Sequence, residues 1–161
     1  MKQVIIAILT LASFGSARAQ MLNVVTADGV TYKFPAAQTG DMTYNAAGDS
    51  VTIMNKRLAV SDITAMNVDD SSMSDDSVSV VYDGASAKIY VAGNVAQYLT
   101  PAVSGAHVSI AADATLAREI TYNLSGSSTD GEFYMSGSYK ATVELDGLTL
   151  KNQNPVTSPG R

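Results

Sequence analysis

Short runs of alternating apolar and polar residues, separated by glycine and Asp-Gly pairs, extend along most of the chain. The runs 30–34 (VTYKF) and 78–82 (VSVVY) are typical. Alternation with a period of two is the pattern of strands that bury one face, whereas amphipathic helices repeat every 3.6 residues. Because the helical repeat is nearly absent, the sequence predicts an all-β protein.

Three pairs of these runs are predicted to form hairpins. Residues 22–34 surround Asp28-Gly29, residues 42–54 contain two runs around a four-residue turn, and residues 78–91 alternate on both sides of Asp83-Gly84. Asp-Gly suits the tight turns that join antiparallel strands. We therefore expect small antiparallel modules in the first two thirds of the chain.

The last third has a different pattern. Residues 120–124, 133–135, 143–145 and 148–150 are predicted as short strands of about three to five residues, joined by glycines. Strands that short, each followed by a glycine corner, are typical of a solenoid. Asp130-Gly131 and Asp146-Gly147 are also turn dipeptides, so hairpins remain an equal alternative at this point.

The first 19 residues have the pattern of a secretory signal peptide. Lys2 provides the positive start, Val4 to Leu11 form an apolar segment, and Ala17 and Ala19 suit the peptidase. The predicted organisation is a signal peptide at 1–19, a β-hairpin leader at 20–68, an acidic linker at 69–77, a small antiparallel module at 78–115, and a solenoid segment with an irregular tail at 116–161. We expect export to the periplasm, the outer surface or the extracellular space.

Charge and composition restrict the partners. Without Lys2 and Arg18 the ten basic residues become eight, and eight against fifteen acidic residues leaves a net charge of −7. An acidic chain repels phosphate backbones and anionic lipids, so we expect neither nucleic acid nor membrane insertion. It is compatible with neutral sugars and divalent cations. The chain has no cysteine, so disulfides do not stabilise it.

Three motifs carry a resemblance to a known family. SGAHVSI, EITYNLSGSSTDGEFYMSG and YKATVELDGLTLKN follow one another between residues 104 and 152. In order and spacing they resemble secreted carbohydrate-binding proteins of gut Bacteroidales, whose fold is a right-handed parallel β-helix like that of pectate lyases. The segments ADGVTYKF and LAVSDITAM are similar to a β-rich leader found before such modules. The resemblance implies polysaccharide binding, with Ca²⁺ as a structural and ligand-bridging ion.

The sequence departs from that family after Leu150. The family continues with several more rungs and carries its calcium ligands there, whereas KNQNPVTSPGR contains two prolines, which cannot donate to a strand ladder. A solenoid needs about three repeats for stability. We therefore expect the N-terminal part of a longer protein, with an open C-terminal edge that a partner or missing coils would cover. The metal ligands are left unknown.

Candidate binding residues are few. Tyr134 and Tyr139 are the predicted carbohydrate contacts, because alternation along 133–135 turns Tyr134 outward and Tyr139 follows in the next turn. Asp69, Asp70, Asp75 and Asp76 fit a solvated linker better than a cation site. His107, the single histidine, is interpreted as a strand-edge residue.

No set of residues for catalysis is apparent. The chain has neither a cysteine nucleophile nor a second histidine for a zinc site, and no paired acid and base stands out. We therefore predict an exported, non-catalytic polysaccharide-binding protein and no enzyme. The alternative is a structural or adhesive cell-surface β-protein without glycan specificity.

Overall fold

The computed structural model describes residues 20–40 and 42–153. Their regular secondary structure consists of β-strands and three short 3₁₀ turns. The strands are β1 (Met21–Thr26), β2 (Val30–Pro35), β3 (Thr43–Tyr44), β4 (Ser50–Ile53), β5 (Lys56–Ala59), β6 (Ile63–Asp69), β7 (Ser77–Asp83), β8 (Ser86–Ala92), β9 (Leu99–Ser104), β10 (His107–Ala112), β11 (Ile120–Ser128), β12 (Glu132–Ser136) and β13 (Ala141–Leu150). Three short 3₁₀ turns connect them: η1 (Ala36–Gln38), η2 (Val60–Asp62) and η3 (Ala96–Tyr98). The all-β prediction is confirmed.

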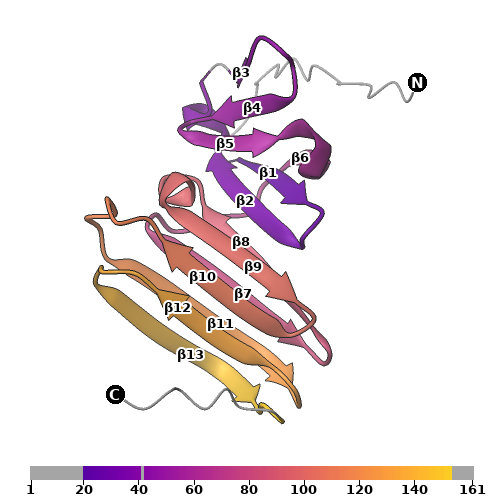
Figure 1. The fold of residues 1–161 in the computed structure, drawn as a ribbon, viewed down its shortest axis with the longest axis vertical. Coiled ribbons are helices and arrows are strands. Elements are labelled where there is room, and N and C mark those ends of the chain that lie inside the picture. The colour runs from indigo at the N-terminus through magenta and orange to yellow at the C-terminus, as the bar shows by residue number, and fades with distance from the viewer. Residues whose placement is uncertain (1–19, 41, 154–161) are drawn as a thin grey trace.

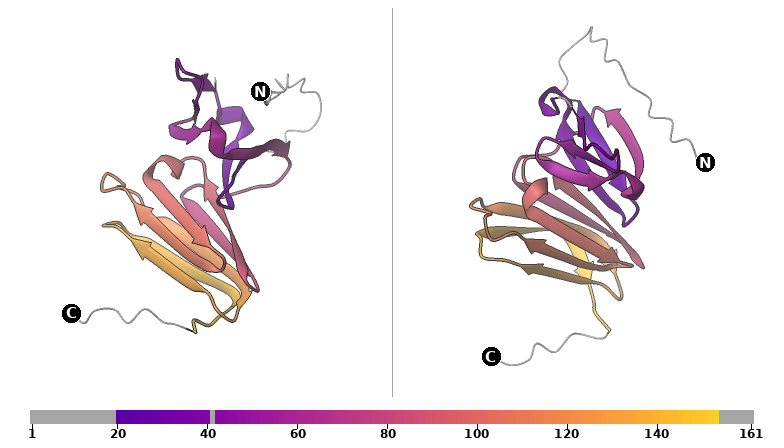
Figure 2. Two further views of the ribbon diagram at one scale, coloured as in Figure 1. Left: turned by 45° about the vertical axis from the view of Figure 1, so that its right-hand side comes forward. Right: turned by 45° about the horizontal axis from the view of Figure 1, so that its top comes forward.

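The strands form three sheets (Figure 1). The largest has seven strands in the order β13-β11-β7-β8-β2-β1-β6, and the other two have the orders β12-β10-β9 and β3-β4-β5. The N-terminal strands lie at one end of the molecule and β13 lies at the other, as all the views show (Figures 1 and 2). No helix in the described residues is long and apolar enough to cross a membrane.

The predicted hairpins are present. Strands β1 and β2 pair antiparallel around Asp28-Gly29, β3 pairs with β4, and β7 pairs with β8 around Asp83-Gly84. The seven-stranded sheet nevertheless runs across the predicted boundaries, because β2 pairs with β8 and β7 pairs with β11. Leader, antiparallel module and C-terminal segment therefore share one hydrogen-bonded sheet.

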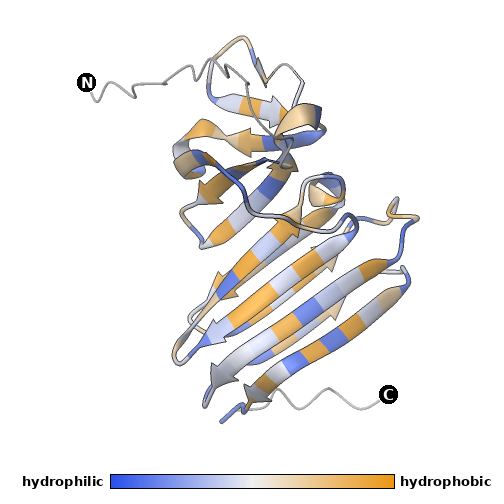
Figure 3. Ribbon diagram, turned by 180° about the vertical axis from the view of Figure 1, so that it is seen from behind, coloured by the Kyte–Doolittle hydropathy of each residue, from blue (hydrophilic) through white to orange (hydrophobic). Residues whose placement is uncertain are grey.

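One apolar core lies between the sheets. Alternate residues of β7, β8 and β11 point into it, including Val80, Ile89 and Tyr122, and Val108 and Ile110 enter it from β10. The alternation of hydropathy along the strands is visible from behind in Figure 3. Burying these faces is the main favourable contribution to folding, at about 25 cal/mol per Å² of apolar surface.

The C-terminal strands pair in parallel. Strand β11 lies between β7 and β13 and is parallel to both, and β10 pairs in parallel with β12 in the smaller sheet. The chain passes from β11 to β12 through Asp130-Gly131 and changes sheets there, so this dipeptide is a corner and not the turn of a hairpin.

Two details of the prediction for this segment were wrong. Residues 143–145 and 148–150 belong to one strand, β13, and β11 and β13 are longer than five residues. The pairing of β11 with β13 shifts register after Ser125, so Gly147 at φ 64° belongs to a bulge within the strand. A bulge keeps the chain in the sheet where a turn would reverse it.

Gly126 is the ladder partner of Tyr82 in the parallel pairing of β11 with β7, and only glycine fits there. Its φ is 83°, and a Cβ atom there would lie 2.0 Å from the carbonyl oxygen of Tyr82. Gly84 also has a positive φ, 61°, but a Cβ atom would meet no atom within 4 Å. A substitution at Gly84 therefore introduces backbone strain alone, whereas a substitution at Gly126 introduces backbone strain and a steric clash.

We predict that Gly126→Ala destabilises the protein much more than Gly84→Ala. The latter should cost about 1–2 kcal/mol for the left-handed conformation alone. The former should cost roughly 2 kcal/mol more, because the β7–β11 ladder must open around the new methyl group. Urea unfolding of both variants measures the difference, and equal losses would contradict the close approach of the two strands.

Three buried tyrosines make the free energy of unfolding sensitive to pH in the alkaline range. Burial raises the pKa of Tyr32 and of Tyr82 to about 12, with smaller contributions from Asp28 and Glu132 respectively. Burial also raises the pKa of Tyr122, and its hydrogen bond with Tyr139 adds to this effect. The folded state therefore favours the neutral phenols.

We predict a loss of stability from about pH 10 upward, where the tyrosines of the unfolded chain begin to ionise. Between that pH and about 12 the unfolded chain binds fewer protons than the folded chain, so the free energy of unfolding falls as the pH rises. Urea unfolding at stepped pH measures the slope, which should be shallower in Tyr82→Phe. Equal slopes in the two proteins would refute the assignment to Tyr82.

Candidate functional site

The three-stranded sheet β12-β10-β9 has an outer face on which mostly small side chains surround the ring of Tyr134. Alternation along β12 places Phe133 on the inner face, where its ring lies 5.5 Å from that of Tyr122. Tyr134 therefore lies on the outer face, and its side chain is 58% exposed. Its partner across the ladder is Ser109 of β10, which in turn pairs with Ala102 of β9. Small side chains therefore lie beside the exposed Tyr134 along the ladder.

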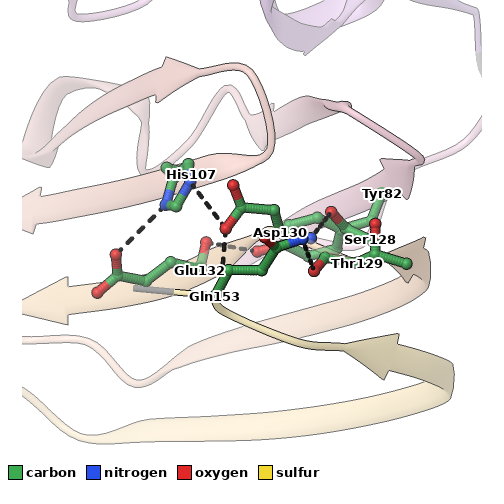
Figure 4. A network of polar contacts seen from close by, with 7 residues as sticks. All are labelled: Tyr82, His107, Ser128, Thr129, Asp130, Glu132 and Gln153. Carbon is green, nitrogen blue, oxygen red and sulfur yellow. Dashed lines mark hydrogen bonds and ion pairs between the residues drawn. The ribbon is translucent and has the colours of Figure 1, made fainter. Parts of the chain in front are cut away.

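A polar cluster lies on the same outer face, two residues before Tyr134. His107 and Glu132 are partners in the β10–β12 ladder, and His107 Nδ1 lies 3.5 Å from Glu132 Oε2. The other ring nitrogen, Nε2, lies 3.9 Å from Asp130 Oδ1. Figure 4 shows these contacts of His107. All three side chains are partly exposed, so they are accessible to a ligand.

Backbone hydrogen bonds hold this cluster in place. The Glu132 amide donates to Ala106 O, and its carbonyl accepts a hydrogen bond from the Tyr82 hydroxyl at 2.9 Å. Asp130 Oδ1 accepts from the amide of Gln153 at 3.2 Å, and the Asp130 amide donates to Ser128 Oγ (Figure 4). Because these hydrogen bonds already order the backbone, ligand binding need not order it again, which avoids that part of the entropy cost.

A shallow depression of about 350 Å³ adjoins His107 and Asp130. Its other lining residues are Gly84, Ala85, Gly105, Ala106 and Thr129. The lining combines small residues with a histidine ring, a hydroxyl and a carboxylate. Carboxylate and imidazole groups can hydrogen-bond with the hydroxyls of a neutral polar ligand.

The structure separates the two predicted contact residues. Tyr139 is partly buried, its hydroxyl is hydrogen-bonded to that of Tyr122, and the two ring centroids are 6.5 Å apart. It therefore packs toward the inner face, whereas Tyr134 lies on the outer face of β12. The two rings do not form a common surface.

Two acidic residues of the linker, Asp69 and Asp76, make polar contacts within the protein. Asp76 accepts a hydrogen bond from Asn94 and pairs with Arg118 at 3.1 Å, and a hydrogen bond from Ser71 lowers the pKa of Asp69. In the described part of the chain no group of three or more histidine, cysteine or acidic residues is placed to hold a metal ion.

Sequence reasoning did not identify the His107 cluster. His107 and Glu132 are 25 residues apart, and their contact depends on the parallel pairing of β10 with β12. Asp130 was recognised only as part of a turn dipeptide. No local pattern indicates that these three residues meet.

Comparison with known proteins adds no assignment. No family model, no curated protein and no solved structure shows significant similarity to this chain. The resemblance to secreted carbohydrate-binding proteins therefore stays a prediction from the motifs, and the geometry of the outer face is the basis for proposing a function.

Proposed function

We propose that this protein is an exported, non-catalytic polysaccharide-binding protein, and that Tyr134 is its principal sugar contact. The observation that carries the proposal is the exposed Tyr134 ring beside the His107, Asp130 and Glu132 cluster. An aromatic face packs against the apolar face of a pyranose ring, while carboxylates and imidazole bind its hydroxyls. Both features lie on one outer face.

The geometry suits an extended glycan chain. Residues two apart on a strand point to the same face and are about 7 Å apart. Tyr134 and Glu132 have this spacing, and Asp130 lies just beyond Glu132 at the corner into β12. A sugar stacked on Tyr134 therefore places its neighbour along the chain beside the polar cluster and the depression.

We further propose that β11, β12 and β13 form the first rung of a right-handed parallel β-helix. Two features support this. Strand β13 pairs in parallel with β11 in the same sheet. Strand β12, which connects them along the chain, belongs to another sheet and is parallel to β10 there. As part of the same proposal, the protein belongs to the Bacteroidales carbohydrate-binding family and is exported. The predicted signal peptide, 1–19, lies outside the described residues.

One observation favours the alternative, a structural or adhesive surface protein. Apolar side chains are exposed at the β13 end of the molecule, including Val143 and Leu145. Exposed apolar groups on an edge strand are typical of surfaces that contact another protein. The alternative and the sugar-binding proposal use different faces, so one experiment can separate them.

We predict that Tyr134→Ala weakens glycan binding about tenfold or more, which corresponds to the loss of one stacking contact. Tyr44→Ala is the matched control, because Tyr44 is also an exposed strand tyrosine but lies on β3 in a different sheet. A glycan array identifies the ligand, and titration calorimetry of the wild type and both variants measures the affinities.

Two results would count against the proposal. One is an array on which the wild-type protein retains no glycan, with or without a chelator. The other is equal binding by Tyr134→Ala and the wild type while circular dichroism shows both to be folded. The second result would exclude Tyr134 as the contact even if a glycan ligand exists.

A further inference from the structure

The end of the molecule formed by β12 and β13 presents uncovered apolar side chains. Val143 is the ladder partner of buried Tyr122, and Leu145 is the partner of buried Leu124, so both lie on the inner face. They are nevertheless 42% and 66% exposed. Met135 of β12, the ladder partner of buried Ile110, is 39% exposed at the same end.

The outer edge of β13 is also free of strand partners in the described part of the chain. The seven-stranded sheet ends with β13, which pairs with β11 on its other side (Figure 1). An edge strand of ten residues presents unpaired N–H and C=O groups that can bind another strand. Apolar side chains and a free edge therefore coincide at one end.

We propose that a second copy of this chain covers this end, with the two β13 strands pairing antiparallel about a two-fold axis through Val143. A two-fold axis makes the contact isologous, so one surface must be complementary to itself. If the axis is perpendicular to the sheet, the inner-face residues of one β13 strand lie opposite inner-face residues of the other. The proposal concerns assembly and does not depend on sugar binding.

The segment from Lys140, which directly precedes β13, to Asp146 is self-complementary in this register. On the inner face Val143 meets Val143 of the second copy, and Leu145 meets Ala141. On the outer face Thr142 meets Glu144, and Lys140 meets Asp146. Opposite charges across a strand pair are stabilising and like charges are not.

The charges involved are available for such pairs. Lys140 forms an exposed ion pair with Glu119 at 2.7 Å, and its side chain remains 77% exposed. Glu144 and Asp146 are exposed and make no ion pair within the described residues. A second copy therefore adds partners to groups that face solvent in one copy.

Other registers that keep the faces matched are less favourable. An axis through Glu144 places this carboxylate against itself, and an axis through Leu145 places Glu144 against Asp146. An axis through Thr142 also pairs Lys140 with Glu144, so the charges alone do not exclude it. It is less favourable because it places Leu145 opposite Tyr139, whose hydroxyl is already hydrogen-bonded to that of Tyr122. The bulge at Gly147 ends the regular alternation, and residues 140–146 are centred on Val143.

Single cysteines test the register directly, because the chain has none of its own. In Val143→Cys the two sulfur atoms would lie across the axis, where opposite Cα atoms are about 4.5–5.5 Å apart, within the range of a disulfide. In Thr142→Cys and Leu145→Cys the same residues of the two copies would be roughly 8 Å and 14 Å apart, beyond that range.

We expect mild oxidation of Val143→Cys to give at least ten times more disulfide-linked dimer than either control variant. We also expect the wild-type protein to sediment as a dimer. Leu145→Glu should weaken this dimer at least tenfold, because two carboxylates would enter an apolar contact. Since Leu145 is largely exposed, this variant should keep the wild-type circular dichroism spectrum and glycan affinity.

Several outcomes would overturn the proposal. A monomeric wild-type protein without cross-linking of Val143→Cys excludes the second copy. Preferential cross-linking of Thr142→Cys or Leu145→Cys excludes the register, and equal cross-linking of all three indicates random collision. A dimer that survives Leu145→Glu must use another surface. Loss of glycan binding in Tyr134→Ala with an intact dimer would leave this proposal unaffected.

Discussion

The parallel pairing of β11 with both β7 and β13 is the interaction on which the rest of the structure depends. It joins the C-terminal segment to the antiparallel strands that precede it and turns the inner faces of three strands into one core. The close approach of Gly126 to the Tyr82 carbonyl is part of this pairing. Because β12 follows β11 through a tight corner, the same pairing also positions the second, smaller sheet.

Parallel pairing also positions the candidate site. Strand β12 aligns with β10, so residues from two distant parts of the chain meet at the same level of the ladder. His107 thereby faces Glu132, and Tyr134 lies over the small residues of β10 and β9. A hairpin of β11 and β12 would have separated these groups. The proposed sugar contact therefore depends on the change of sheet at Asp130-Gly131.

The β13 end of the seven-stranded sheet differs from the rest of the molecule because apolar side chains are exposed there. Strand β11 is flanked by β7 and β13, whereas β13 has no strand beyond it in the described residues. Val143 and Leu145 are therefore exposed although they are equivalent to Tyr122 and Leu124. The proposed second copy of the chain would cover these side chains.

Much of the fold could be predicted from local patterns. Asp28-Gly29 and Asp83-Gly84 mark turns, and the alternation on both sides of each turn indicates which residues face the core. The C-terminal strands were recognised but not their pairing, because Asp-Gly permits either a hairpin turn or a corner between sheets. Gly147 was interpreted as a break in the strand, whereas its positive φ accommodates a bulge opposite Gly126.

The candidate site was less predictable. Alternation along β12 was sufficient to place Tyr134 outward, because the orientation of a strand residue is a local property. Tyr139 lies outside the strands, and its packing against Tyr122 depends on the contact between the two sheets. The contacts of His107 with Asp130 and Glu132 depend on register between strands, which has no local signal.

The sequence alone therefore determined the all-β class, the hairpins and the faces of the individual strands, because these follow from residues that are neighbours along the chain. The tertiary structure decided which strands are parallel, which polar groups share a surface and which apolar groups are left uncovered. These features depend on pairing between distant segments, and the free energy of that pairing comes from the burial of whole strand faces.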